Sequence, residues 1–217
     1  ILEHEEKVVG VVTGSLGVRW YDVVVTGMEM HAGPTPMPIR KDALYAATFL
    51  LQSVVGIAND HQPDGRGTVG EIHAHPGSRN VIPGQVRFTA DLRHEDEATL
   101  TRMDQEWRRV CDDIAVAHGV QVDLKDVQTF RPTPFDPDLV DKVRQGAASR
   151  GLPAMNIVTG AGHDAVYMAA VAPTAMIFVP CKDGVSHNEI EDAQPEHLEA
   201  GCNVLLDAMV ARANAAR

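Results

Sequence analysis

Apolar and polar positions along this chain alternate between the period of a strand and the period of a helix. Residues 85–93 alternate strictly, with Val86, Phe88, Ala90 and Leu92 on one parity, which predicts a strand with one buried face. In residues 97–118, apolar residues instead recur every three or four positions, and Gly119 follows them. This spacing predicts an amphipathic helix that ends at the glycine.

The same reading over residues 18–131 predicts six elements in the order βαββαβ. They are a strand ending at Gly27, a helix over about 40–60, a strand over 67–75, the strand and helix above, and a strand through Val120, Val122 and Leu124. This order is typical of the ferredoxin-like unit, in which two helices cover one face of a four-stranded antiparallel sheet.

The segments on either side, 1–17 and 132–217, predict part of an α/β sheet. They offer a strand over 7–13, helices over about 138–150 and after Gly162, a buried strand over 175–179, and a final helix from about Pro195. That helix carries Leu198, Cys202, Leu205 and Met209 on one stripe. About 100 residues are few for a sheet covered on both faces, so we expect this portion to be incomplete.

Composition excludes several classes of protein. The 217 residues carry a formal net charge of -11, which argues against nonspecific binding of nucleic acid and against anionic membranes. Three cysteines without a CxxC pair, Cys111, Cys181 and Cys202, favour reduced thiols and a cytoplasmic protein. The chain begins at Ile1 rather than Met, and we expect it to lack upstream sequence.

Two loops and one strand end of the predicted ferredoxin-like unit carry candidate chemistry. His31 begins a segment with two prolines and a glycine, rigid enough to hold a hydrogen-bond donor toward a developing oxyanion. The alternative is a loop whose histidine only bonds nearby backbone. Asn80 and Arg93, if close together, would bind a small carboxylate through an amide and a two-pronged guanidinium. The alternative there is a turn and a solvated sheet face.

Two further candidates lie in the carboxyl-terminal segment. Gly162 and His163 precede a short helix, where glycine lets a ligand approach the backbone and a helix start favours oxygen anions; the alternative is a capped turn. His187 follows the buried strand, where imidazole is a common metal ligand. A catalytic zinc site normally needs about three protein ligands, and no convincing set accompanies His187. The alternative is that His187 has only a structural role.

Taken in order, these segments resemble the amidohydrolase branch of the M20 metallopeptidase superfamily, which includes N-carbamoyl-L-amino-acid hydrolases, β-ureidopropionases and allantoate amidohydrolases. The resemblance rests on the motifs GVVTG (10–14), HAGPTPM (31–37), RKDA (40–43), SRNVIPG (78–84), DLR (91–93), GAGHD (160–164), IFVP (177–180) and SHN (186–188).

The resemblance implies a lid and dimerisation domain, residues 18–131, inserted into part of an α/β metallohydrolase catalytic domain that holds two divalent ions, zinc or else manganese, cobalt or nickel. His187 would be a metal ligand, and His31 would stabilise the tetrahedral intermediate in a partner subunit's site. Asn80 and Arg93 would hold the substrate carboxylate, while Gly162 and His163 would line its pocket. The implied partners are a small ureido or carbamoyl acid and a second copy of the chain.

The remaining family motifs, His-x-Asp, a Glu-Glu pair and His-Ile-Glu-Gln-Gly, precede the point where this chain starts. We therefore expect the chain by itself to be catalytically incomplete and to bind metal weakly or not at all. The nearest alternative is an M20 aminoacylase or dipeptidase. An alternative of another class is a noncatalytic dimerisation or binding module.

Overall fold

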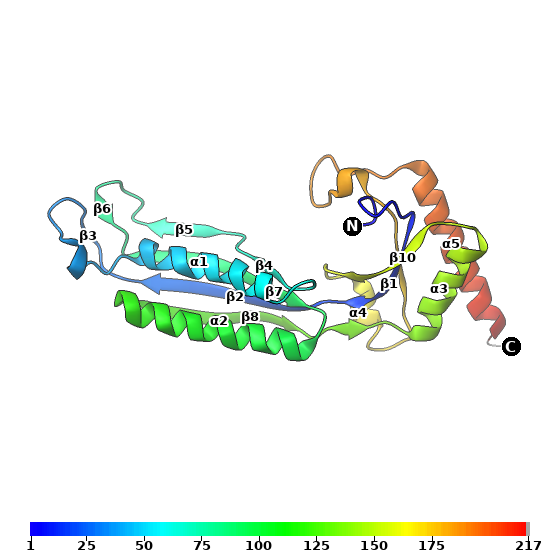
Figure 1. Ribbon diagram of the computed structural model, residues 1–217, viewed down its shortest axis with the longest axis horizontal. Helices are drawn as coiled ribbons and strands as arrows, with labels where there is room; N and C mark the ends of the chain where they lie inside the picture. Colours follow the sequence, from blue (N-terminus) through cyan, green and yellow to red (C-terminus); the bar gives the residue numbers. More distant parts are fainter. Residues whose placement is uncertain (216–217) are drawn as a thin grey trace. The chain divides into compact units, whose positions relative to one another are not determined.

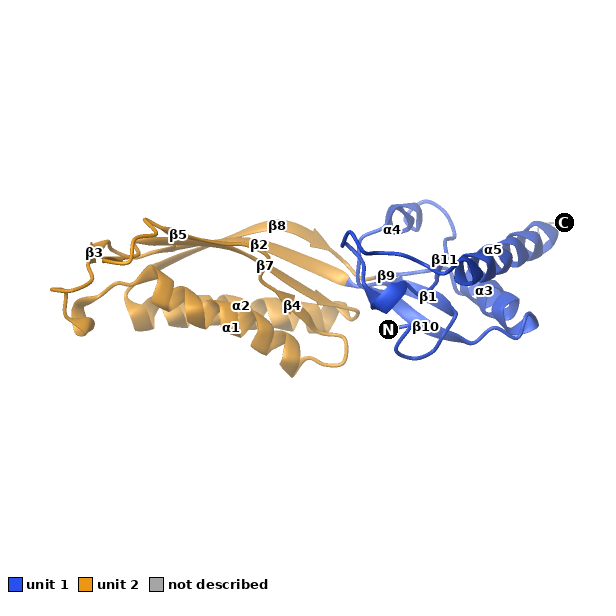
Figure 2. Cartoon of the chain, turned by 90° about the horizontal axis from the view of Figure 1, so that it is seen from above, with its two compact units in different colours: residues 1–16, 133–217 blue, residues 17–132 orange. Residues whose placement is uncertain are grey.

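A computed structural model describes residues 1–215, which form two compact units (Figure 2). Unit 1 contains residues 1–16 and the chain from Thr133 onward, and unit 2 contains Gly17–Pro132. No helix among the described residues is both long and apolar enough to cross a bilayer.

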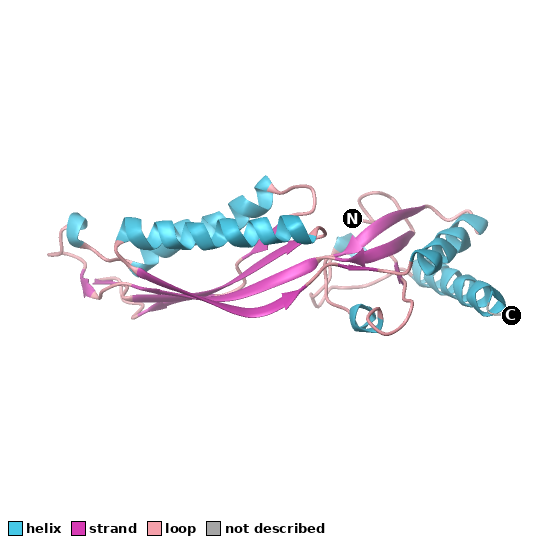
Figure 3. Ribbon diagram, turned by 90° about the horizontal axis from the view of Figure 1, so that it is seen from below, coloured by secondary structure: helices cyan, strands magenta, loops and turns pink. Residues whose placement is uncertain are grey.

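Unit 2 has the predicted ferredoxin-like arrangement. In chain order it contains β2 (Gly17–Thr26), α1 (Ala43–Asp60), β4 (Arg66–Thr68), β5 (Ile72–His75), β7 (Gln85–His94), α2 (Glu97–His118) and β8 (Gln121–Phe130). The antiparallel sheet has the order β4-β7-β2-β8, and β5 also pairs with β7. Both helices lie on the same face of the sheet (Figure 3), so the predicted layers are confirmed.

The single strand predicted over 67–75 is wrong, because the structure divides it into β4 and β5. Thr68 pairs with Asp91 and Ile72 pairs with Phe88. The chain therefore advances four residues on this edge while β7 advances three. The one extra residue interrupts the hydrogen-bonded pairing, as a β-bulge does.

The core of unit 2 forms where α1 and α2 cover the apolar parity of β2 and β7. The alternation predicted for β7 is confirmed, since Val86, Phe88, Ala90 and Leu92 are all buried. Each helix begins at an aspartate whose carboxylate accepts backbone N–H groups, Asp42 for α1 and Asp96 for α2, which satisfies donors that a helix start leaves open. These caps fix where both helices begin along the sheet.

At one end of unit 2, two short strands extend beyond the main sheet. They are β3 (Met30–His31) and β6 (Val81–Ile82), which pair with each other, and a 3-10 turn, η1 (Met37–Ile39), follows β3. We call this end, residues 28–40 and 76–84, the tip. The opposite end, residues 17–19, 91–94 and 130–132, is called the proximal end because the chain enters and leaves unit 2 there. Figure 1 shows β3 and β6 far from the start of β2.

Unit 1 is a small mixed sheet with helices. β1 (Val9–Ser15) pairs in parallel with β10 (Ala154–Thr159) and antiparallel with β11 (Met176–Phe178), while β9 (Thr133–Pro134) pairs with the end of β1. The helical segments are α3 (Pro137–Ser149), α4 (Asp164–Met168), η2 (Lys182–Gly184) and α5 (Pro195–Ala215). Val9, Val11 and Val12 of β1 are buried in the core of this unit.

The four residues of the stripe predicted on α5 line one groove, but they are not the residues that the helix buries. The residues that α5 buries are Ala200, Val204 and Ala208. These small residues allow a close approach to α3, where a Cβ added at Gly146 would lie 3.4 Å from the Val204 carbonyl oxygen. Because of the helical period, the larger side chains lie on another side of α5, away from that contact.

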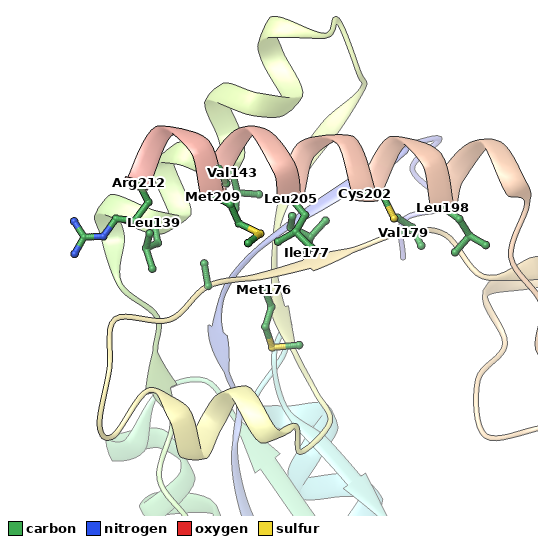
Figure 4. A pocket seen from close by; sticks show the side chains of 13 residues that line it. Leu139, Val143, Met176, Ile177, Val179, Leu198, Cys202, Leu205, Met209 and Arg212 are labelled. Atoms are coloured by element: carbon green, nitrogen blue, oxygen red, sulfur yellow. The ribbon is translucent and has the colours of Figure 1, made fainter. Parts of the chain in front are cut away.

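Leu198, Leu205 and Met209 are at least half exposed and line an apolar groove of about 490 Å³ between α5 and β11. Figure 4 shows Leu205 and Met209 directed from α5 toward the strand. The strand predicted as buried is therefore only half-buried: Met176, Ile177 and Phe178 are all of intermediate exposure.

Two adjacent valines of α1 test the packing of unit 2. Val54 is fully buried and Val55 is 48% exposed. Val54→Ala removes two buried methyl groups and leaves a cavity, so we expect a loss of about 2 kcal/mol in the free energy of unfolding. Val55→Ala, the matched control, should change it by less than about 0.5 kcal/mol. Urea denaturation measures both, and equal losses would contradict the described orientation of α1.

Candidate functional site

The tip brings His31 and Asn80 together. In the β3–β6 pair, His31 lies opposite Val81, and the Ala32 N–H donates to the Asn80 carbonyl oxygen at 2.9 Å. Both side chains are exposed. Two loops separated by about fifty residues in the sequence thus present an imidazole and an amide at the same end of unit 2.

The His31 ring is held by the loop that follows it. Its Nδ1 accepts a hydrogen bond from the Gly33 N–H at 3.1 Å. Next to it, the Asn80 side-chain Oδ1 accepts from the Ser78 hydroxyl at 2.8 Å. His31 therefore does bond nearby backbone, as the alternative interpretation expects. The same bond leaves Nε2 as the ring nitrogen available for a ligand.

Arg93 lies at the proximal end, opposite Val18 of β2. Its Nε is 3.0 Å from both carboxylate oxygens of Asp91, and its Nη2 donates to Asp91 Oδ2 at 2.5 Å. Both side chains are about one-fifth exposed. Asp91 therefore holds the guanidinium in a fixed orientation with multiple charge-assisted hydrogen bonds.

The structure does not bring Asn80 and Arg93 together within one chain, as a shared carboxylate site required. Asn80 precedes β6 at the tip, whereas Arg93 is near the far end of β7. The eight steps from Gln85 to Arg93 alone span about 27 Å at about 3.4 Å per residue of antiparallel strand. The condition that the two side chains are close together is not met within one chain, because β7 is continuous between them.

In unit 1, His163 is the residue that precedes α4 and points back to β10. Its Nε2 is 3.0 Å from the hydroxyl oxygen of Thr159, and its ring lies 5.6 Å from that of Phe178. The Thr159 hydroxyl oxygen also accepts from the Ala161 N–H at 3.1 Å. Gly162 is exposed, with nothing within 4 Å of where a Cβ would stand. Open space beside Gly162 is compatible with a ligand close to the backbone.

Sequence reasoning missed Thr159. Thr159 is 1% exposed and joins the loop amide to the imidazole through one hydroxyl. Its position at the end of a strand and immediately before a glycine-rich loop was the only available signal, because a threonine in a strand is ordinarily a packing residue.

His187 lies in the loop after η2 with a φ of 55°, and its N–H donates to Glu191 Oε2 at 3.1 Å. Its side chain is exposed. Residues 1–215 contain no group of three or more His, Cys, Asp or Glu side chains placed to hold a metal ion. A catalytic zinc site uses about three protein ligands, so the donors described here do not by themselves make a metal centre.

One cysteine, Cys111, lies in the core of unit 2. All three cysteines are free thiols. Burial raises the pKa of Cys111 to about 12, with a further contribution from the neighbouring Asp112 carboxylate. The Cys111 thiol therefore stays protonated at neutral pH, and a protonated thiol is a weak nucleophile and metal ligand.

Comparison with known proteins places the chain in a family. Residues 4–211 match Peptidase family M20/M25/M40, and the chain belongs to that family. The N-carbamoyl-L-amino-acid amidohydrolase of Rhizobium meliloti is 44% identical over 97% of this chain, which covers 50% of that protein. The allantoate amidohydrolase of Bacillus subtilis (strain 168) is 34% identical over 96% of this chain and is likewise covered over 50% of its length.

Solved structures agree with this placement. The amidase of the hydantoinase/carbamoylase family from Burkholderia multivorans has 53% sequence identity and a TM-score of 0.94, covering 98% of this chain and 52% of that one. The chain therefore spans about half the length of the relatives it matches. The resemblance found in the sequence motifs is confirmed at the level of the family and of its amidohydrolase members.

Substitution of Thr159 tests the loop that carries Gly162 and His163. Thr159→Val keeps the shape but removes the acceptor of the Ala161 N–H, so we expect a loss of about 0.5–1.5 kcal/mol in the free energy of unfolding. Thr159→Ser keeps a hydroxyl and is the control. Chemical denaturation should separate the two variants, and a Val variant as stable as the Ser variant would show that the hydroxyl does not hold the loop.

Proposed function

We propose that this chain supplies the lid and the carboxyl-terminal part of the catalytic domain of a metal-dependent amidohydrolase. The reaction is hydrolysis of the carbamoyl or ureido C–N bond in N-carbamoyl-L-amino acids or related ureido acids. Support comes from the relatives, which are N-carbamoyl-L-amino-acid and allantoate amidohydrolases. The assembled enzyme uses two divalent ions in each site, and His187 contributes one ligand to them.

One observation supports a site built from two copies: His31 and Asn80 lie at the tip, and Arg93 lies at the proximal end of the same unit. A ureido acid is only a few bonds long, so one molecule does not reach both ends. If all three side chains act on one substrate, they come from two copies of the chain. The proposed assembly is therefore a homodimer in which the tip of one copy completes the site of the other.

Each side chain then has a role that matches its chemistry. Arg93, fixed by Asp91, offers donors to the substrate carboxylate in one copy, and the partner's tip presents the Asn80 amide to the same group. When water adds to the carbamoyl carbon, negative charge develops on the carbonyl oxygen. The His31 Nε2 donates a hydrogen bond to that oxygen, which stabilises the tetrahedral intermediate.

Hydrolysis of the carbamoyl group releases the amino acid, ammonia and carbon dioxide. An aminoacylase or dipeptidase would instead release an intact acid or a second amino acid. Assays with N-carbamoyl, N-acetyl and dipeptide forms of the same amino acid distinguish these reactions. We expect the largest kcat/KM for the carbamoyl substrate, and turnover of none of the three by the assembled enzyme would favour a noncatalytic binding module.

Removal of the Arg93 guanidinium should weaken substrate binding. In the assembled enzyme we expect Arg93→Ala to raise KM for a carboxylate substrate by about 10- to 100-fold, because a charged hydrogen bond is lost. Arg87→Ala is the matched control, since Arg87 is an exposed arginine on the same strand whose Nε bonds Gln85. An unchanged KM in Arg93→Ala would remove Arg93 from the substrate site.

Mixing two inactive variants tests whether the site is shared. A dimer of one His31→Ala copy and one Arg93→Ala copy has one site with both native residues and one site with neither. Random exchange makes half of the dimers mixed, so activity should recover to about a quarter of the native value. Each variant alone is the control. Without recovery in dimers shown to be mixed, both residues would have to act within one chain.

A further inference from the structure

The bond to His31 defines which of its nitrogens carries the proton. The Gly33 backbone N–H can only donate, so the Nδ1 that it contacts at 3.1 Å must accept. A neutral imidazole with an accepting Nδ1 has its proton on Nε2. The loop after His31 thus selects the tautomer in which Nε2 is a hydrogen-bond donor.

One side chain holds that loop in place. The Arg40 Nη2 donates to the Ala32 carbonyl oxygen at 2.6 Å and to the Thr35 carbonyl oxygen at 2.9 Å, and the Arg40 Nε donates to the same Thr35 oxygen at 3.1 Å. These two carbonyls stand on either side of Gly33. The planar fork of a guanidinium fixes both at once, which a lysine ammonium on a flexible stem does less well.

Arg40 can act as a clamp because its own backbone is anchored to the sheet and to α1. The next residue, Lys41, accepts from the Met28 N–H at 2.8 Å. A Cβ at Gly27 would lie 2.0 Å from the Lys41 carbonyl oxygen, so the end of β2 and residue 41 are in direct backbone contact. Asp42 then caps α1. The guanidinium therefore connects the loop of His31 to the rigid part of unit 2.

We propose that Arg40 is a positioning residue for His31: it holds loop 32–35 so that the Gly33 N–H donates to Nδ1 and the ring proton stays on Nε2. Any effect of this arrangement on catalysis rests on the proposed function of His31. The position of the ring proton does not depend on that function. Of the two neutral tautomers, only the Nε2–H form can donate to a developing oxyanion from the outer nitrogen of the ring.

The test reads the tautomer directly by long-range ¹H–¹⁵N NMR of the 217-residue chain, at a pH where the imidazoles are neutral. The His31 signals are assigned by their loss in His31→Gln. The native chain should show the Nε2–H pattern. Arg40→Met, which keeps the stem and removes the donors, should lose it in favour of a mixture of both tautomers, and Arg40→Lys should be intermediate. Arg87→Met is the control and should keep the native pattern.

A second pair of variants avoids dependence on the folding of Arg40→Met. Gly33→Pro removes the donating N–H while leaving Arg40 intact, and should also give mixed tautomers. Gly33→Ala keeps the N–H, and its Cβ would be 3.4 Å from the nearest His31 atom, so it should retain the native pattern. An Nδ1–H pattern in the native chain, or an unchanged pattern in either folded variant, Arg40→Met or Gly33→Pro, would overturn the proposal.

Kinetics of the assembled enzyme separate this proposal from the proposed function. We expect Arg40→Met to lower kcat by about tenfold with little change in KM, part of the 10²–10³-fold effect of losing an oxyanion donor, and Arg40→Lys to restore part of it. If the tautomer changes and kcat does not, Arg40 still positions the ring, and the catalytic role of His31 is what fails.

Discussion

The length of the β2–β7 pairing determines where every candidate residue of unit 2 can act. The two strands pair over ten consecutive residues, from Gly17 with His94 to Thr26 with Gln85. A continuous antiparallel pairing of this kind separates its two ends by about 30 Å. Arg93 lies in β7 at one end of this pairing, and the loops that carry His31 and Asn80 extend from the opposite end.

Packing keeps that separation fixed. Helices α1 and α2 lie along the same face, and the buried side chains between the layers, among them Leu50, Leu92 and Trp107, leave no room for the sheet to fold back on itself. Protein interiors of this density respond to strain by discrete repacking rather than by bending. If one substrate uses all three side chains, as proposed, this sheet requires that they come from two copies of the chain.

Much of the fold follows from local pattern. Strict alternation predicted β7, and the helical stripe before Gly119 predicted α2 with its observed bounds, because one buried face imposes each period. The bulge between β4 and β5 escaped prediction, since it arises from register against β7 rather than from the residues of the strand itself. The face that α5 buries also escaped prediction, because it carries the small residues Ala200, Val204 and Ala208 rather than the larger apolar ones.

The sequence supplied candidate site residues one by one, but not their arrangement in space. The motifs identified His31, Asn80, Arg93, His163 and His187, and the β3–β6 pairing joins the first two. The distance between Asn80 and Arg93 was hidden because both motifs are close in sequence, separated by one strand. Arg40 and Thr159 act through hydrogen bonds to backbone groups, and such contacts carry no sequence signature of their own.

The most direct measurement is a crystal structure of the assembled enzyme with a carboxylate substrate analogue bound. The account predicts that the analogue's carboxylate contacts Arg93 of one copy and Asn80 of the other, with His31 from that second copy at the carbamoyl oxygen. An analogue held by Arg93 and Asn80 of the same chain, or by neither, would contradict it.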